Sequence, residues 1–207
     1  MKNLLILCCL TYIFSFSNAL YAQDYASAET MPINYKKRSP IYDYSEKQLN
    51  NTDTIPDFDT KESKLKITGT IYLADGVTAA KDIILYVNQP DENGNYELKK
   101  DAYRKRYVQH RGWIKTDADG RYTFYTFMPG KFLSSKELKQ IHRVIKEPGK
   151  PEYKISSFFF DDDPLLPELS LAFRAKTAQS MLKLEKEGDM YVATKDIILK
   201  EDIENFQ

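Results

Sequence analysis

Residues 112–130, GWIKTDADGRYTFYTFMPG, constrain the fold more than any other stretch of this chain. A short apolar strand leads into a turn rich in Asp and Gly, and an aromatic and β-branched run, residues 121–127, follows it. Asx side chains and a glycine that can adopt positive φ favour a tight reversal, so we expect a hairpin. The second strand is apolar enough to pack on both faces, away from a sheet edge. Further sheets must therefore surround this hairpin.

The remaining apolar segments predict those sheets. Residues 65–73 alternate between apolar and polar side chains, which is typical of a half-buried strand. We expect further strands at residues 81–87, 140–145, 152–160, 181–184 and 190–199, with the last two forming a hairpin around Gly188 and Asp189. Residues 165–178 have the spacing of one short helix. Because helices and strands do not alternate, the fold class is all-β, an antiparallel β-sandwich with at most one short helix.

The N-terminal residues predict export. Lys2 precedes an apolar run of about 13 residues, shorter than the ~20 that span a bilayer, and small residues follow it. We expect residues 1–22 to be a signal peptide, with no membrane span after its cleavage and a final location in the periplasm, on the cell surface or outside the cell. Cys8 and Cys9 lie inside this segment, so the mature chain has no disulfide. We expect residues 23–63, which are polar and lack glycine, to form a flexible arm, and residues 64–203 to form the domain.

The charge balance excludes one class of partner. The chain has 30 Lys and Arg against 30 Asp and Glu, so no bulk charge attracts it to nucleic acid. An aromatic small molecule or a glycan remains as the expected partner. Two local runs each allow two interpretations: residues 99–106, KKDAYRKR, form a solvated loop or bind an anionic ligand or polysaccharide, and the acidic residues 161–163 form a solvated turn or bind calcium.

Five segments resemble, in order, the successive blocks of intradiol ring-cleavage dioxygenases, above all their small exported members. These segments, within residues 65–166, are GTIYLADG, DIILYVNQPDENGNY, RGWIKTDADGRYTFYTFMPGKF, QIHRVIKEPG and FFFDDDP. A shorter part of the pattern, T-D-x-D-G-x-Y-x-F, also occurs in transthyretin-like and carboxypeptidase-regulatory-like sandwich modules. The longer match favours the dioxygenases and implies their β-sandwich fold.

The same resemblance implies a non-haem Fe(III) ion held by two tyrosines and two histidines, with catechol-type rings as substrates. Phenolates are hard anionic donors that suit Fe(III). Carried over by position, Tyr96 matches the first tyrosine and His142 the second histidine, whereas Phe132 and Gln140 stand at the other two ligand positions. Phenylalanine has no phenol oxygen and glutamine offers only a neutral amide. We therefore expect a degraded iron site.

Three functions remain open from the sequence. The first is a non-catalytic descendant that keeps the fold and its cleft for binding. The second is an active dioxygenase for a catechol or hydroxyquinol, whose rearranged ligand set includes Tyr96 and His142, with His110, Tyr103 or Tyr107 as replacement ligands. The third is a surface carbohydrate-binding or adhesion module, in which Tyr96 and His142 are ordinary side chains of the sheet.

Overall fold

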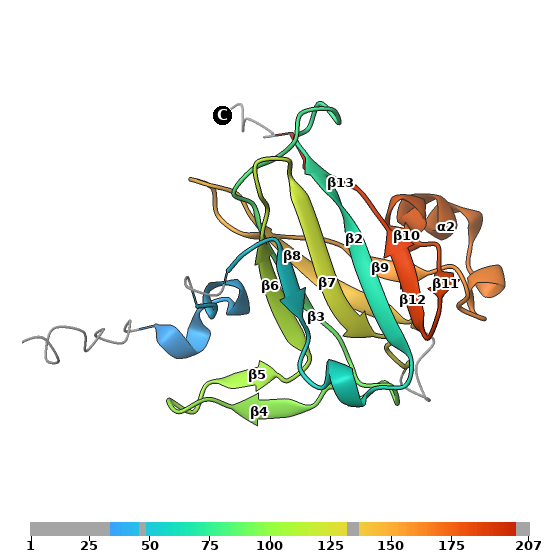
Figure 1. The fold of residues 1–207 in the computed structure, drawn as a ribbon, viewed down its shortest axis with the longest axis horizontal. Coiled ribbons are helices and arrows are strands. Elements are labelled where there is room, and N and C mark those ends of the chain that lie inside the picture. The colour runs from blue at the N-terminus through green and yellow to red at the C-terminus, as the bar shows by residue number, and fades with distance from the viewer. Residues whose placement is uncertain (1–33, 46–48, 132–136, 202–207) are drawn as a thin grey trace, which may run out of the picture. The chain divides into compact units, whose positions relative to one another are not determined.

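The computed structural model describes residues 34–45, 49–131 and 137–201 (Figure 1). The predicted signal peptide, residues 1–22, lies outside the described residues. Residues 1–37 form one unit, whose described part contains the 3-10 turn η1 (Tyr35–Lys37). Residues 38–207 form a second, compact unit, to which all of the following features belong.

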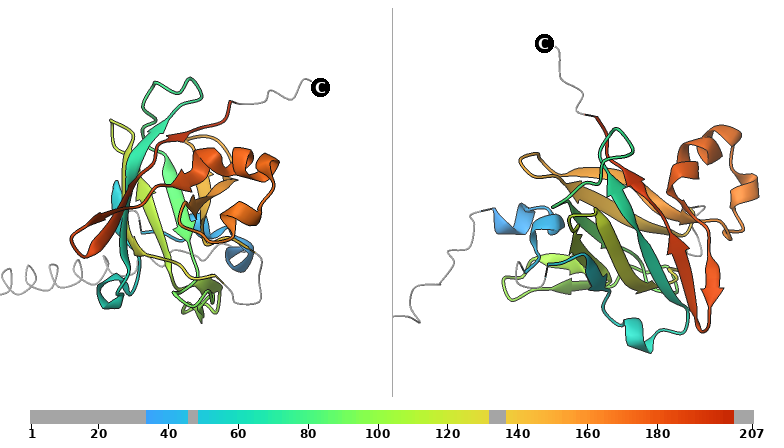
Figure 2. Two further views of the ribbon diagram at one scale, coloured as in Figure 1. Left: turned by 90° about the vertical axis from the view of Figure 1, so that its right-hand side faces the viewer. Right: turned by 45° about the horizontal axis from the view of Figure 1, so that its top comes forward.

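Two β-sheets face each other in this unit (Figures 1 and 2). The first has the strand order β1-β7-β2-β12-β11, with β13 also paired to β2. Its strands are β1 (Thr52–Thr54), β2 (Lys64–Tyr72), β7 (Arg121–Phe127), β11 (Glu185–Glu187), β12 (Met190–Thr194) and β13 (Ile197–Ile198). The second has the order β10-β9-β8-β3-β6. Its strands are β3 (Ile84–Asn88), β6 (Arg111–Lys115), β8 (Gln140–Lys146), β9 (Tyr153–Phe160) and β10 (Met181–Leu182).

Smaller elements lie around the two sheets. They are the ribbon of β4 (Leu98–Lys100) and β5 (Arg106–Val108), the 3-10 turns η2 (Pro40–Tyr42), η3 (Phe58–Thr60), η4 (Leu166–Glu168) and η5 (Ala178–Ser180), and the helix α2 (Leu171–Thr177). Among the described residues α2 is the only α-helix; Ser170 caps it, accepting a bond from the Phe173 amide at 3.2 Å. The Phe173 ring packs edge-on against Phe159 of β9. Within residues 34–45, 49–131 and 137–201, no helix is long and apolar enough to cross a membrane.

Apolar side chains from both sheets fill the space between them. Strand alternation turns every second side chain inward, and each large apolar residue buried in this way contributes about 1.5–3 kcal/mol. The largest contributors are Leu65, Ile67, Ile71, Leu85, Tyr122, Phe124, Phe127, Ile141, Ile145, Phe158 and Phe160. The predicted sandwich with one short helix is confirmed. The sheet centres are antiparallel, whereas β1, β10, β12 and β13 join by parallel pairing.

The predicted hairpin within residues 112–130 is wrong, although both of its strands exist. β6 pairs with β3 in the second sheet, whereas β7 lies between β1 and β2 in the first, so the chain crosses from one sheet to the other. Asp117 closes the turn by accepting bonds from the amides of Asp119 and Arg121. The Gly120 carbonyl then accepts from the Ile71 amide at 2.8 Å, which directs β7 onto β2. The interior position of β7 is as predicted.

The C-terminal segments also pair differently from the prediction. Residues 181–184 do not form a hairpin with the last strand, because β10 adds in parallel to β9. The hairpin around Gly188 exists, but its first strand is β11, which pairs antiparallel with β12.

The structure places much of the predicted arm, residues 23–63, in the folded unit. β1 pairs with β7, and the side chains of Ile41 and Ile55 are buried. Asp43 forms a buried ion pair with Lys105, with 2.6 Å between Oδ2 and Nζ. Residues 38–45 and 49–63 therefore belong to the sandwich in this structure, whereas residues 23–33 and 46–48 lie outside the described part.

Candidate functional site

Tyr96 follows a turn that the backbone holds in place. The Asp91 carboxylate accepts bonds from the amides of Asn93 and Asn95, both at 2.8 Å, and Gly94 adopts a φ of 85°. The Gly130 amide donates to the Asp91 carbonyl at 2.8 Å, and a Cβ at Gly130 would overlap the Glu92 carbonyl. The turn before Tyr96 is thus packed directly against the turn that follows β7.

His142 reaches Tyr96 from the outward-facing side of β8. Its neighbours Ile141 and Arg143 are buried, so alternation points the imidazole away from the core. The Tyr96 Oη lies 2.7 Å from Nε2 of His142, and the two rings stack at 5.9 Å between centroids. Nδ1 of His142 lies 3.1 Å from the hydroxyl of Ser157. The structure therefore brings together the two residues that the sequence identified.

Both groups of this pair are neutral at neutral pH. Tyr96 is 40% exposed, and the burial of the rest of the side chain, reinforced by the charge of Glu137, raises its pKa to about 12. Burial and the charge of Lys154 lower the pKa of His142 below its usual value. One tautomer satisfies the pair, with the phenol donating to Nε2 and Nδ1–H donating to Ser157. The two side chains complete each other's hydrogen bonds.

The donor set does not fit the ferric site that the resemblance implies. Phe132 lies outside the described residues and has no donor atom, and Gln140, at the start of β8, carries a neutral amide. The remaining phenol is held in its protonated form by its surroundings. One imidazole and one neutral phenol make a weak set for Fe(III), which prefers anionic oxygen. The prediction that Tyr96 and His142 are metal ligands therefore stays a prediction.

His110, considered as a replacement ligand, has other partners. Its Nε2 lies 3.2 Å from an Asp57 oxygen, and donor atoms of Asp57, Glu97 and His110 lie within 4.8 Å of one another. The His110 Nδ1 is buried and has no hydrogen-bond partner in the described part of the chain, whereas a ligating histidine normally donates its second N–H. Among the described residues, no hydrogen bond or ring contact joins His110 to Tyr96 or His142. This trio therefore lacks the support of a metal centre.

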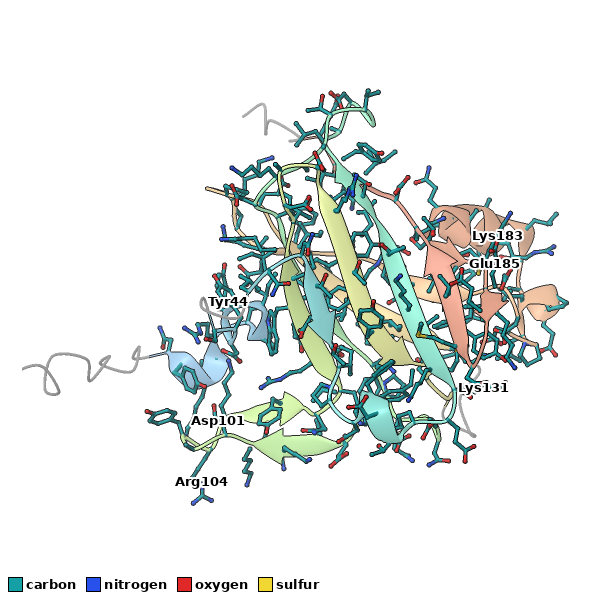
Figure 3. All side chains as sticks on the ribbon, viewed as in Figure 1. Tyr44, Asp101, Arg104, Lys131, Lys183 and Glu185 are labelled. Carbon is teal, nitrogen blue, oxygen red and sulfur yellow. The ribbon has the colours of Figure 1, made fainter. Side chains whose placement is uncertain are left out.

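The two replacement tyrosines lie in or beside the β4–β5 ribbon. Tyr107 stacks on the Arg111 guanidinium at 3.8 Å, and Tyr103 is exposed near the ribbon's tip, where Figure 3 shows Asp101 and Arg104.

The two charged runs have structural roles. Within residues 99–106, Lys105 is buried and paired with Asp43. In the acidic turn, Asp163 accepts bonds from the amides of Lys139 and Leu165, and Asp162 pairs with the Lys139 ammonium at 3.0 Å. These bonds engage two of the three carboxylates of the turn within the protein.

Arg143 is a candidate functional residue that the sequence analysis missed. It is only 5% exposed, although arginine is rarely buried without a charged partner. A signal was available: Arg143 occupies the inward position of β8 between Ile141 and Ile145. A cation at a core position of an alternating strand indicates a special role.

Comparisons with known proteins identify the fold. No protein-family model matches the chain, and no curated protein sequence matches it. Solved structures do match it, among them the dioxygenase domain of a carbohydrate-binding fusion protein from Streptomyces sp. SirexAA-E. That match has 20% identity and a TM-score of 0.56, and covers 73% of this chain and 88% of that one.

Two further matches agree with the first. An intradiol ring-cleavage dioxygenase from Tetranychus urticae is 19% identical, with a TM-score of 0.57 and coverage of 76% of this chain and 90% of that one. The 3-chlorocatechol 1,2-dioxygenase from Rhodococcus opacus 1CP is 18% identical, with a TM-score of 0.57 and coverage of 76% and 69%. The resemblance deduced from the sequence is therefore confirmed at the level of the fold, which this chain shares with the intradiol dioxygenases.

Proposed function

We propose that this protein is an exported relative of the intradiol dioxygenases that uses the fold to bind a ligand and does not cleave it. One observation carries the proposal: Tyr96 and His142, the two remaining donors at the family's ligand positions, are hydrogen-bonded to each other at 2.7 Å. A ferric ion would have to displace the proton shared by this pair and ionise a phenol whose pKa partial burial raises to about 12. Phe132 and Gln140 supply nothing to offset that cost.

The comparison with working metal sites supports the same conclusion. Changing residues that merely contact a ligand costs metal sites about 10- to 100-fold in affinity. This chain replaces two direct ligands, one anionic oxygen and one imidazole. Iron affinity in a cell would then fall below what a resident cofactor requires. The fold and the Tyr96–His142 surface remain.

For the ligand we propose a catechol-type aromatic molecule. The exposed Tyr96 ring stacked on His142 offers an aromatic surface with polar atoms at its edge. Rings with hydroxyl groups suit such a surface, because they stack and hydrogen-bond together. The match to a 3-chlorocatechol dioxygenase supports the same class. A glycan, the other ligand expected from the sequence, uses similar contacts. The test below distinguishes glycan binding from catechol binding.

The test combines binding with oxygen consumption. The full chain is titrated with catechol, with benzene as a ring without hydroxyl groups, and with a soluble oligosaccharide, while an oxygen electrode records turnover after iron addition. We expect catechol to bind without oxygen uptake, and about tenfold more weakly in Tyr96→Phe and His142→Asn. Oxygen uptake lost in these variants would instead establish the active dioxygenase. Binding of the oligosaccharide alone would establish the carbohydrate-binding module.

Export is tested separately. We expect N-terminal sequencing to show that the protein recovered outside the cytoplasm begins shortly after Ala19 or Ala22. Recovery of the uncleaved chain from the cytoplasm would contradict export.

A further inference from the structure

A pocket of about 520 Å³ opens beside β8 and β13. Segments from distant parts of the sequence line it, including β8, β9, η5 and the chain from Thr194 to Lys200. Its volume lies within the range of about 300–1,000 Å³ that small-molecule sites occupy. The lining residues that matter chemically are Arg143, Ser180, Lys195, Asp196, Ile197 and Lys200. None of them belongs to the pair of Tyr96 and His142.

Arg143 has spare hydrogen-bonding capacity in this pocket. Its Nε donates to the Ser156 carbonyl at 2.6 Å, and its Nη2 donates to the Ser180 hydroxyl at 3.0 Å. The guanidinium also lies 3.8 Å above the Phe158 ring, which fixes its plane. A guanidinium has five N–H donors, so within the described part of the chain three have no hydrogen-bond partner, two on Nη1 and one on Nη2. A guanidinium can bind a carboxylate through two parallel N–H···O bonds, and Arg143 lines the pocket.

The charge of Arg143 is not balanced by a paired acid. Among the described residues no carboxylate forms an ion pair with it, and burial lowers its pKa to about 10, which leaves it charged at neutral pH. A buried cation without a partner pays a desolvation cost of several kcal/mol. The attraction between Arg143 and an anion that enters the pocket would offset part of this cost. The site is thus prepared for negative charge before any ligand arrives.

Neighbouring charges make the pocket positive. Lys195 and Lys200 line it beside Arg143, and the one acid of the lining, Asp196, uses an oxygen to accept the Thr70 amide at 2.8 Å. Burial and then the charge of Arg143 lower the pKa of Lys195, as expected for crowded cations. Lys183, labelled in Figure 3 near the edge of the sandwich, adds to the same positive field.

We propose that this pocket binds a small organic carboxylate with an apolar body. The carboxylate lies against the free end of the Arg143 fork, with Lys195 as the second cation. The apolar body contacts the side chains of Ile155, Ile197 and Ile198, which line the same pocket. Benzoate is the simplest probe of this class, because it combines a planar carboxylate with a compact apolar ring.

This pocket is independent of the surface formed by Tyr96 and His142. Arg143 and His142 are consecutive residues of one strand, so their side chains leave opposite faces of the sheet. Benzoate binding should therefore be unaffected by Tyr96→Phe. Failure of the carboxylate site leaves the catechol proposal standing, and the reverse also holds.

The test is calorimetric titration of the full chain with benzoate, phenyl phosphate and benzamide. We expect benzoate to bind, benzamide not to bind, and phenyl phosphate to bind more weakly because its tetrahedral head does not match the fork. Arg143→Lys keeps the charge but loses the fork and should weaken benzoate binding about tenfold. Lys195→Gln should weaken it about threefold. Lys99→Gln, at a surface lysine paired with Glu97, is the control and should bind as the parent does.

Several outcomes would overturn the proposal. Equal binding of benzamide would show that binding does not require a negative charge on the ligand. Tighter binding of phenyl phosphate would show that the pocket does not prefer a carboxylate. No heat with benzoate at millimolar concentration would exclude the site. If Arg143→Lys fails to fold, as judged by near-UV circular dichroism, Lys195→Gln decides, and its unchanged affinity would count against the pocket.

Discussion

His142 and Arg143 are neighbours on β8, yet their side chains meet opposite conditions. His142 faces outward, and both of its ring nitrogens are satisfied by Tyr96 and Ser157. Arg143 faces inward, is buried, and bonds to Ser156 and Ser180, which leaves three of its five N–H donors without a partner among the described residues. One side of the strand holds a closed, neutral pair, and the other holds an open, charged fork.

The difference shows where this fold retains binding capacity. At the position that the dioxygenase resemblance marks as a metal site, Tyr96 and His142 are hydrogen-bonded to each other. The position that the resemblance does not mark has a buried guanidinium with no paired acid among the described residues, and this guanidinium lines a pocket. Function inferred from a family motif alone would therefore overlook the second site.

The largest effect is expected at the close approach that shapes the Arg143 pocket. A Cβ at Gly69 would overlap the backbone carbonyl of Lys195, which cannot move without displacing the pocket rim. We expect Gly69→Ala to lower the free energy of unfolding by about 2–4 kcal/mol, measured by urea denaturation. Gly149→Ala is the matched control. Its Cβ meets nothing within 4 Å, so only its positive φ costs about 1 kcal/mol. Equal losses in the two variants would show that the contact at Gly69 is not limiting.

A smaller effect is expected from the hydrogen bond that holds the same rim. The Tyr122 hydroxyl donates to the Lys195 carbonyl at 2.5 Å from within the core. Tyr122→Phe keeps the ring but leaves that carbonyl without this donor, so we expect a loss of about 1–2 kcal/mol in the free energy of unfolding. Benzoate affinity should fall as well, because Lys195 loses one of the two hydrogen bonds that hold its backbone among the described residues. The other is from its amide to the Thr68 carbonyl at 2.7 Å. A variant with unchanged stability and affinity would contradict this role.

The closed pair on the outer face should contribute less. Tyr96 is exposed and His142 is half-buried, so their bond is partly replaced by water when either is removed. A double-mutant cycle with Tyr96→Phe and His142→Asn should give a coupling energy of about 0.5–1 kcal/mol. Strictly additive losses would show that the two side chains do not interact.

The smallest effect concerns pH and distinguishes the two neighbours directly. Burial lowers the pKa of His142 below its ordinary 6.5, so the unfolded chain binds the proton more tightly than the folded chain. The stability that neutral His142 provides is present above about pH 6.5 and is lost as the pH falls through its lower folded pKa. The free energy of unfolding should therefore decrease on acidification from pH 7 to about 5. His142→Asn should reduce that decrease, whereas Arg143→Lys should not change it.

The sequence predicted the strands of this fold better than their pairing. Residues 121–127 indicate a strand because they are aromatic and β-branched. Residues 140–145 indicate one because apolar and polar side chains alternate. The turn at Asp117–Gly120, however, has the same local chemistry whether it closes a hairpin or carries the chain to the other sheet. The decision depends on the pairing of β7 with β2, which is remote in sequence. The same reason explains why the packing of Asp43 on Lys105 was not predicted.

The candidate site divides in the same manner. Tyr96 and His142 could be found because the order of the motifs along the chain matches that of the intradiol dioxygenases. Arg143 was visible only as a charge at an inward position of a strand. The surroundings of its guanidinium are formed by Ser156, Ser180 and Lys195, which come from other elements. No local pattern contains that information.

The central claim is that Tyr96 and His142 form a closed pair and not half of a working iron centre. The most direct measurement is the iron content and visible absorbance of the purified protein after loading with Fe(III), beside Tyr96→Phe. We predict no tightly bound iron and no visible band in either protein, because the phenol remains protonated and bonded to His142. Stoichiometric iron with a broad tyrosinate band, absent from Tyr96→Phe, would contradict the account.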